Sequence, residues 1–360
     1  MRESWSGPPS WKRTSADAPM HRSSAMAGSL SRILACLLLL VLASGCARSK
    51  AEQQASNPSG LELTELRYEP YSGIVSFPEL AEDLGYLRPL KLKYMGSTIS
   101  GPASIQNVVT GETDFGGAFN GAIIKLIAAK APIKAVVGYY GADAETFMGF
   151  YVLEGSPIRG GRDLIGKKVA MNTLGAHSEF MWREYLTRQG LSDEEIKQTT
   201  LVVVPPSNAE QALRQKQVDV VSLSQVFRHK AVERGGIRLL FSDYSVFGAF
   251  TAGSLVMTEK FMSQNPRTAR KFVQGVARAI EWTRSAPREQ VVARFQKLIR
   301  QRGTEADADA QKYWRSATVA SQGGRISDKE FQVWIDWMVK DGQLKAGQIK
   351  ASDLYTNEFQ

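Results

Sequence analysis

Short apolar runs alternate with helix-like segments along most of this 360-residue chain, and this alternation is the feature that most constrains its fold. Between residues 61 and 258 the apolar runs are separated by segments with helical periodicity, and Leu90–Met95 followed by Pro102–Thr110 is one such pair. Spacing of this kind favours strands of a mostly parallel sheet that is covered by helices. The sequence therefore predicts an α/β fold.

The pattern starts again near the middle of this region, which predicts two α/β lobes. We expect the chain to leave lobe 1 near residues 145–150 and to return near residues 243–253. Lobe 1 then comprises residues 61–148 plus 250–360, and lobe 2 comprises residues 149–249. Two crossings make a hinge, and the cleft between the lobes is the natural pocket.

The last part of the chain is almost entirely helical, and we expect it to pack on lobe 1 as a C-terminal tail. Its helices are expected over Pro266–Ser285, Arg288–Arg302, Asp307–Ser316 and Asp328–Asp341. No internal repeat of fixed period appears, so a repeat architecture is not indicated.

Eleven apolar residues, Ile33 to Ala43, run into the sequence Ala43-Ser44-Gly45-Cys46. The stretch is shorter than the roughly 20 residues that span a bilayer. It fits the apolar core of an export signal, with Arg22 and Arg32 as its basic leader. Because it ends on small residues and a cysteine, it resembles a bacterial lipoprotein signal, which implies cleavage before Cys46 and lipid on that thiol. An ordinary secretory signal with an incidental cysteine is the alternative.

Residues 1–45 are therefore expected to be the export signal. An export leader begins near its basic region, and a start at Met20 or Met26 would give a signal of ordinary form. Residues 46–60 are polar and lack apolar periodicity, which predicts a flexible tether between the lipid and the folded body.

The folded body is expected to contain no cysteine, since Cys36 lies in the removed segment and Cys46 carries the lipid. This excludes a disulfide framework and a thiolate metal site there. The formal net charge of +9 becomes +6 without residues 1–45, which hold five Lys/Arg and two Asp/Glu. This excess suits an anionic solute or an anionic membrane surface. The basic residues are scattered and form no nucleic-acid-binding motif, so we expect no nucleic acid, metal or cofactor.

Three polar loops precede predicted helices, and the first contains Ser97, Thr98, Ser100 and Gly101. A helix N-terminus exposes unpaired N–H groups and the positive end of the helix dipole. Hydroxyls placed there suit a sulfonate, carboxylate or phosphate. Gly101 allows close approach of the backbone to a ligand. A plain N-cap by Ser100 is the alternative.

The second loop holds Thr173, Gly175, Ala176 and His177 and opens a helix in the second lobe. A lone histidine in this position is more often a hydrogen-bonding residue at a helix start than a catalyst. The third loop holds Phe119 and Asn120 among glycines that make room for a ligand or, alternatively, tighten a strand–helix turn. Each lobe would thus contribute helix N-termini to one cleft.

Several segments, in this order along the chain, resemble the sulfonate/nitrate/taurine and thiamine-precursor branch of substrate-binding proteins that serve ATP-driven importers. They are Ser100–Ala103, Val109–Gly116, Gly155–Ile158, Asp163–Ala170, Gly175–His177, Pro205-Pro206 and Gln217–Val220. The resemblance implies a two-lobed periplasmic-binding-protein fold of type II. The chain departs from the family where a Trp-Asp-Pro-Tyr-like run is replaced by Ser224–Phe227.

The resemblance implies a monomeric, non-catalytic receptor that captures a small anionic organic solute, sulfonate- or taurine-like, and delivers it to an ABC permease. Cys46 would anchor it to a bacterial membrane, in the periplasm or at the cell surface. The expected ligand contacts are Tyr71, Ser97, Thr98, Ser100, Gly101, Phe119, Asn120, Thr173, Gly175, Ala176 and His177.

Other readings remain open on the sequence alone. The ligand is alternatively a thiamine-pyrimidine precursor or nitrate-like, or the chain is a ligand-sensing subunit. Stacking on a pyrimidine would come from Tyr71, Phe119, Tyr139, Tyr140 and Phe147. An arginine in the cleft would strengthen the hypothesis that the ligand is an anion. The candidate residues are Arg67, Arg159, Arg162 and Arg228. A pyrimidine synthase with the same fold is disfavoured, because its histidine/cysteine-rich iron site has no counterpart here.

Overall fold

The structure is a computed structural model that describes residues 60–360. The expected export signal, Cys46 and the tether up to residue 59 lie outside the described residues. Among residues 60–360, no helix has the length and apolar character needed to cross a membrane.

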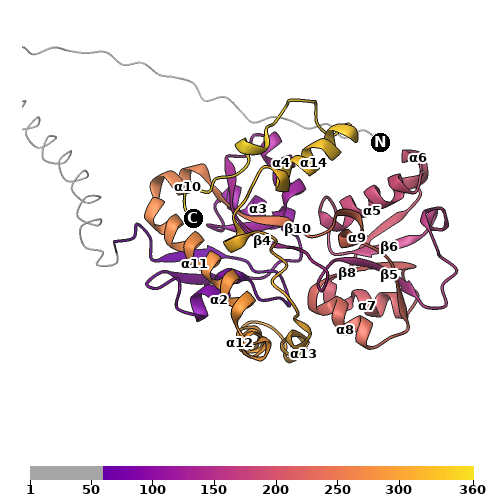
Figure 1. The fold of residues 1–360 in the computed structure, drawn as a ribbon, viewed down its shortest axis with the longest axis horizontal. Helices are drawn as coiled ribbons and strands as arrows, with labels where there is room; N and C mark the ends of the chain where they lie inside the picture. Colours follow the sequence, from indigo (N-terminus) through magenta and orange to yellow (C-terminus); the bar gives the residue numbers. More distant parts are fainter. Residues whose placement is uncertain (1–59) are drawn as a thin grey trace, which may run out of the picture. The chain divides into compact units, whose positions relative to one another are not determined.

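Two of the three sheets belong to the part of the molecule that we call lobe 1 (Figure 1). Strands β1 (Glu65–Tyr68) and β2 (Lys91–Tyr94) pair in parallel. The second sheet has the order β3-β10-β4, with β3 at Gly116–Phe119, β4 at Ile133–Ala142 and β10 at Phe250–Thr258. Strand β10 is central and runs antiparallel to both neighbours.

The third sheet defines lobe 2 and has five strands in the order β7-β6-β8-β5-β9. They are β5 (Gly149–Leu153), β6 (Lys168–Met171), β7 (Thr200–Val203), β8 (Val220–Leu223) and β9 (Ile237–Ser242). Strand β6 pairs in parallel with β7 and β8, whereas β5 runs antiparallel to β8 and β9.

The expected α/β class and two-lobed fold are thus confirmed, but the sheets are mixed rather than mostly parallel. The antiparallel pairs involve β5 and β10, the strands that follow the two crossings between the lobes. An apolar run shows that a strand is buried and says nothing about its direction. The sequence therefore located these strands without giving their orientation.

Helices cover the sheets of both lobes. In lobe 1 and the tail they are α2 (Phe77–Asp83), α3 (Gly101–Thr110), α4 (Asn120–Ala128), α10 (Glu259–Gln264), α11 (Pro266–Ser285), α12 (Arg288–Arg300), α13 (Glu305–Ala310) and α14 (Lys329–Lys340), with short 3-10 turns η2 (Gln311–Tyr313), η3 (Gln322–Gly324) and η4 (Ala351–Asp353). In lobe 2 they are η1 (Gly161–Leu164), α5 (His177–Arg188), α6 (Asp193–Ile196), α7 (Pro206–Arg214), α8 (Gln225–Glu233) and α9 (Asp243–Phe247).

The alternation of side chains along β6 explains why lobe 2 has helices on both faces of its sheet. Val169 belongs to the same core cluster as Trp182 of α5, whereas the next residue, Ala170, packs with Ala209 and Leu213 of α7. Successive side chains of a strand point to opposite faces, so each face has its own apolar layer. Figure 1 shows α5 on one side of this sheet and α7 with α8 on the other.

The expected helix over Asp307–Ser316 is shorter in the structure. Helix α13 ends at Ala310, η2 ends at Tyr313, and the chain continues without helical structure to Thr318, which has a φ of 54°. A β-branched residue rarely adopts a positive φ. Tertiary contacts therefore override the helical pattern here, and this segment forms part of the pocket described below.

The C-terminal tail packs on lobe 1, as expected, and also reaches lobe 2. Helix α14 contacts α4 of lobe 1. From the same helix, Trp337 Nε1 donates to Glu184 Oε2 of α5 at 2.8 Å. Tyr313 of η2 donates to Glu233 of α8 at 3.2 Å. The tail therefore joins the two lobes at two separate places.

Candidate functional site

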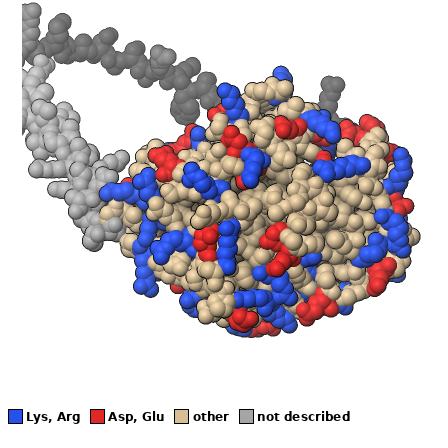
Figure 2. Space-filling view, in the orientation of Figure 1, with Lys and Arg blue, Asp and Glu red and all other residues tan. Residues whose placement is uncertain are grey.

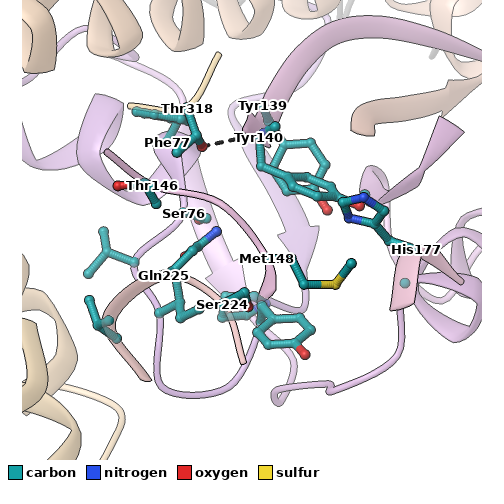
Figure 3. Close-up of a pocket in the computed structure, with 18 of the residues that line it drawn as sticks. Ser76, Phe77, Tyr139, Tyr140, Thr146, Met148, His177, Ser224, Gln225 and Thr318 are labelled. Carbon is teal, nitrogen blue, oxygen red and sulfur yellow. Dashed lines mark hydrogen bonds between the residues drawn. The ribbon is translucent and has the colours of Figure 1, made fainter. Parts of the chain in front are cut away.

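A cavity of about 190 Å³ lies between the lobes. Lobe 1 contributes the ends of β1, β3 and β4, and lobe 2 contributes the first residues of α5 and α8. The crossing segment that contains Thr146–Met148 and the tail segment ending at Thr318 complete its wall. Figure 3 shows Tyr140, Met148, His177 and Ser224 around the same space.

Aromatic side chains dominate the cavity wall. All five aromatic residues that the sequence offers for stacking line it: Tyr71, Phe119, Tyr139, Tyr140 and Phe147. Burial raises the pKa of the hydroxyl groups of Tyr71, Tyr139 and Tyr140. These tyrosines therefore stay uncharged at neutral pH and present flat rings with neutral hydroxyl groups to a ligand.

Gly117 of β3 makes room for one of these rings. A Cβ atom at this position would lie 2.8 Å from Cζ of Tyr139, closer than side chains normally approach. The glycine-rich third loop thus shapes the cavity by allowing a tyrosine to lie against the strand.

Two titratable groups, His177 and Asp243, meet at the cavity wall. His177 Nε2 lies 3.3 Å from Asp243 Oδ2, but their alignment forms no hydrogen bond, and neither atom has another partner. Burial lowers the pKa of His177 to about 3. Burial raises the pKa of Asp243 to about 7, against the lowering effect of hydrogen bonds from backbone amides. The imidazole ring is therefore neutral at physiological pH.

The His177 ring stacks on Phe119, with 5.0 Å between the ring centroids and 10° between the planes. The two rings come from different lobes, since Phe119 ends β3 and His177 begins α5. The lobes therefore touch at the cavity wall, and a ligand there would be enclosed by residues of both lobes, a geometry that can link binding to hinge closure.

None of the four candidate arginines lines the cavity, although Arg228 lies directly behind Phe147 of its wall. Arg67 pairs with Asp114 at 2.7 Å, and Arg162 pairs with Glu195 at 3.2 Å. Arg159 donates to the carbonyl of Ser156, and Arg228 lies over the ring of Phe147 and donates to the hydroxyl of Tyr151.

Of the described residues that line the cavity, Arg315 is the only lysine or arginine, and its side chain is exposed. Two carboxyl groups, those of Glu69 and Asp243, also line it. Figure 2 shows acidic and basic side chains interspersed over the visible face of the molecule. The charges at the cavity therefore do not favour a strongly anionic ligand.

The expected ligand contacts divide into two groups. Those that line the cavity are Tyr71, Thr98, Gly101, Phe119, Ala176 and His177. Those that do not are Ser97, Ser100, Asn120, Thr173 and Gly175. In the second group, Ser100, Asn120, Thr173 and Gly175 make hydrogen bonds within the protein.

Ser100 acts as the N-cap of α3, which was the alternative reading of the first loop. Its Oγ accepts from the amide of Ala103 at 3.3 Å and from Thr173 Oγ1 at 3.1 Å. Asn172 Nδ2 also donates to the carbonyl of Ile99 at 2.9 Å. The first and second loops therefore bind each other across the cleft.

Asn120 and Gly175 make hydrogen bonds within the protein. Asn120 is fully buried, its Nδ2 donates to the carbonyl of Glu330 and its Oδ1 accepts from Ser254. A side chain satisfied in this way inside the core is structural. The amide of Gly175 donates to Glu179 at 2.8 Å, so it closes the start of α5.

Several cavity residues gave no usable signal in the sequence. Gln225 and Thr318 both have a positive φ, of 48° and 54°, although neither is glycine. Such conformations cost of the order of 1–3 kcal/mol and persist where the surrounding structure fixes them, often at functional sites. Asp243 follows the last residue of β9, and its place at a strand end is the signal that could have indicated it in the sequence.

Within residues 60–360, no group of three or more His, Cys, Asp or Glu side chains is placed to hold a metal ion. The cavity offers rings, hydroxyl groups and one histidine–aspartate pair, which suit binding of an organic molecule.

A two-lobed α/β fold with a cavity between the lobes defines the class of periplasmic binding proteins. The chain belongs to the NMT1/THI5-like family, whose model matches residues 80–290. None of the curated proteins with which the sequence was compared matches it.

Solved structures with the same fold include a protein of Bordetella bronchiseptica RB50, with 20% identity and a TM-score of 0.70 over 83% of this chain and 96% of that one. The alkanesulfonate-binding protein SsuA of Xanthomonas axonopodis pv. citri, bound to MOPS, has 19% identity and a TM-score of 0.63, with 82% and 99% covered. The nitrate-binding protein NrtA of Synechocystis PCC 6803 has 14% identity and a TM-score of 0.65, with 83% and 88% covered. The fold also occurs in the desulfurization enzyme DszB, at 13% identity and a TM-score of 0.54, with 82% and 97% covered.

Proposed function

We propose that this chain is the extracytoplasmic solute-binding component of an ABC-type import system. A cavity with walls from both lobes of one chain is the observation that carries the proposal. The family and the fold shared with SsuA and NrtA support it. The lobes are proposed to comprise residues 61–148 plus 250–360 and residues 149–249, and the position of the five-stranded sheet within residues 149–242 supports these boundaries.

The receptor is proposed to act without catalysis and as a monomer, because a single chain supplies the whole cavity. DszB shares the fold and is an enzyme, so the fold alone does not decide this. The printed sequence places both cysteines before residue 47, and no cavity residue is a cysteine. The hydroxyl of Ser178, which follows His177 in the sequence, contacts Ser222, Asn172 and Met148 rather than a base.

The ligand that the cavity supports best is a flat, largely uncharged organic molecule such as a pyrimidine precursor. Its ring would stack against aromatic side chains of the wall such as Tyr140. An anionic solute of the sulfonate or nitrate type is the second candidate. It is favoured by Thr98 and Gly101, which line the cavity at the N-terminus of α3, because helix N-termini bind anions.

Isothermal titration of the full chain distinguishes these ligands. We expect heat with a substituted pyrimidine and none with an alkanesulfonate, taurine or nitrate. Tyr140→Ala should weaken binding by about tenfold or more, because it removes a stacking partner. Tyr86→Ala is the matched control, since Tyr86 lies outside the cavity wall. Binding of the anions alone would support the second candidate. If none of the four compounds gave heat of binding, the proposal of a receptor for these solute classes would be contradicted.

The receptor is also proposed to be a lipoprotein that is held to a bacterial membrane through Cys46. The apolar stretch and the Ala43-Ser44-Gly45-Cys46 junction support this. Anchoring would keep the binding protein close to its permease.

A further inference from the structure

Tyr139 and Tyr140 are neighbours in the sequence, yet both side chains line the cavity. In a regular strand, successive side chains point to opposite faces of the sheet. Strand β4 has a bulge at this point. Two adjacent residues of β10 pair with Tyr140 and Gly138, which leaves Tyr139 as the extra residue of β4. Bulges re-aim side chains and are common next to active sites, and this one turns two tyrosines toward the same space.

Two glycines make room for these rings. A Cβ atom on Gly253 would lie 2.0 Å from Cε1 of Tyr140. One on Gly117 would lie 2.8 Å from Cζ of Tyr139. The rings meet edge to face, with 4.9 Å between their centroids and 73° between their planes, and Figure 3 shows the two residues side by side. The bulge and the two glycines therefore hold both rings at one place in the wall.

The hydroxyl groups of this pair have no hydrogen-bond partner among the described residues. Tyr68 and Tyr313, by contrast, each donate to a glutamate. A buried tyrosine hydroxyl usually finds such a partner. Neither hydroxyl oxygen of the pair belongs to the unpartnered atoms that are closed off from the surface, so both are open to the cavity that they line. A ligand can therefore supply the missing partner.

Both hydroxyl groups keep their protons at neutral pH. Burial raises the pKa of Tyr139 and of Tyr140. The hydroxyl groups of Tyr139 and Tyr71 and the carboxyl group of Asp243 raise the pKa of the Tyr140 hydroxyl further. A neutral phenol has one O–H donor. The pair therefore presents two uncharged donors, close enough for one to shift the pKa of the other.

The charged groups near the pair favour neither sign of ligand charge. Burial raises the pKa of Asp243 to about 7, so its carboxyl group is only partly ionised at neutral pH. Arg228, which lies behind Phe147 of the wall, acts in the opposite direction on that pKa, and its positive charge offsets the negative charge of the carboxylate. Arg315 lines the wall but is exposed. An uncharged acceptor suits this setting.

We propose that Tyr139 and Tyr140 determine the specificity of the cavity by donating hydrogen bonds from both hydroxyl groups to a carbonyl oxygen on a flat, uncharged ligand. This inference rests on the proposed solute-binding function and narrows the ligand class to rings that carry a carbonyl group. A carbonyl oxygen has two lone pairs, so it can accept from both hydroxyl groups. A ring without an acceptor would leave both hydroxyl groups unpaired when it excludes water from the cavity, which costs free energy.

Two pyrimidine probes, one with a ring carbonyl group and one without, test the proposal. Pyrimidin-4-one and pyrimidine are titrated into the full chain by calorimetry at neutral pH. We expect pyrimidin-4-one to bind about tenfold more tightly or better, because each of the two neutral hydrogen bonds contributes roughly two- to tenfold. Equal affinities, or tighter binding of pyrimidine, would overturn the proposal.

Tyrosine-to-phenylalanine variants supply the second arm, since they remove a hydroxyl group and keep the ring. Tyr139→Phe and Tyr140→Phe should each lower the preference for pyrimidin-4-one by roughly two- to tenfold, and the double variant should abolish it. The readout is the ratio of two affinities of the same protein, so a loss of stability alone does not imitate the effect.

Tyr86→Phe is the matched control. The hydroxyl group of Tyr86 also has no hydrogen-bond partner among the described residues, but Tyr86 lies outside the cavity wall. The preference for pyrimidin-4-one should be unchanged in this variant. A preference that survives in the double variant of Tyr139 and Tyr140 would also overturn the proposal.

The two proposals fail in different ways. If neither pyrimidine probe binds but an alkanesulfonate, taurine or nitrate does, the solute receptor stands and the proposed role of the tyrosine pair is wrong. If no solute of either kind binds to protein that is folded by circular dichroism, both proposals are wrong.

Discussion

At the scale of single residues, the cavity wall depends on a buried ion pair behind it. Arg302 and Glu79 are 8% and 5% exposed, and Arg302 Nε lies 2.5 Å from Glu79 Oε1. Glu79 also accepts from the hydroxyl of Tyr68 and from Ser76, while Arg302 donates to the carbonyl of Ile74. Tyr68, Ile74 and Ser76 all line the cavity.

Removing Arg302 should therefore destabilise the protein strongly. In Arg302→Met the carboxylate of Glu79 loses its buried partner, and breaking such a pair costs about 3–5 kcal/mol. Urea denaturation measures the change in the free energy of unfolding. The double variant Arg302→Met, Glu79→Gln should recover part of the loss, because the uncompensated charge is gone.

Arg300→Met is the matched control two positions earlier. Arg300 pairs with Glu305, but both side chains are largely exposed. Exposed pairs contribute little to stability, so we expect no comparable loss. If Arg302→Met were as stable as Arg300→Met, the ion pair would not be what supports this wall.

Individual residues also explain why only part of the site could be predicted from the sequence. Tyr71, Phe119 and His177 stand next to turn and helix-start signals, and those signals are local. The partners of Asp243 and the positive φ of Thr318 depend on segments far apart in the chain. Such features arise only when the tertiary structure forms, so no local pattern contains them.

At the scale of elements, α14 and α5 hold the lobes together outside the cavity. Trp337 donates to Glu184, Arg183 donates to Asp341 at 3.1 Å, and the rings of Phe180 and Trp337 lie 4.6 Å apart. The sequence predicted both helices from their periodicity. It did not predict their contact, because the polar partners lie more than 150 residues apart.

Weakening this contact should shift the lobes toward a more open arrangement. Trp337→Phe keeps an aromatic ring but removes the hydrogen bond to the carboxylate of Glu184, which is worth roughly 1.5–3 kcal/mol. Because the proposed ligand would contact both lobes, any loss of the joined state should lower the apparent affinity. Small-angle scattering without ligand should give a larger radius of gyration.

Trp282→Phe is the control for this experiment. Trp282 lies on α11 and contacts Arg294 of the neighbouring helix α12. This contact is not one between the two lobes. The radius of gyration should not change in this variant. An unchanged radius in Trp337→Phe as well would mean that α14 does not hold the lobes together.

At the scale of the whole molecule, the cavity and the expected membrane anchor belong to separate parts of the chain. The described residues, 60–360, lie in one compact unit, and Cys46 precedes them in the sequence. The wall of the cavity uses residues from 68 to 318 of that unit. The printed sequence therefore indicates that attachment and binding can be separated by changing one residue.

Cys46→Ala should release the protein from the membrane and leave solute binding intact. The substitution removes the thiol that would carry the lipid and touches no residue of the cavity wall. Cell fractionation should move the variant to the soluble exported fraction, and titration should give the dissociation constant of the unaltered protein within about twofold, or roughly 0.4 kcal/mol. Cys36→Ala is the matched control, since Cys36 lies in the segment expected to be removed, and this variant should stay with the membrane. Retention of Cys46→Ala in the membrane fraction would contradict the lipoprotein assignment, whereas release with weakened binding would mean that the anchor and the cavity are coupled.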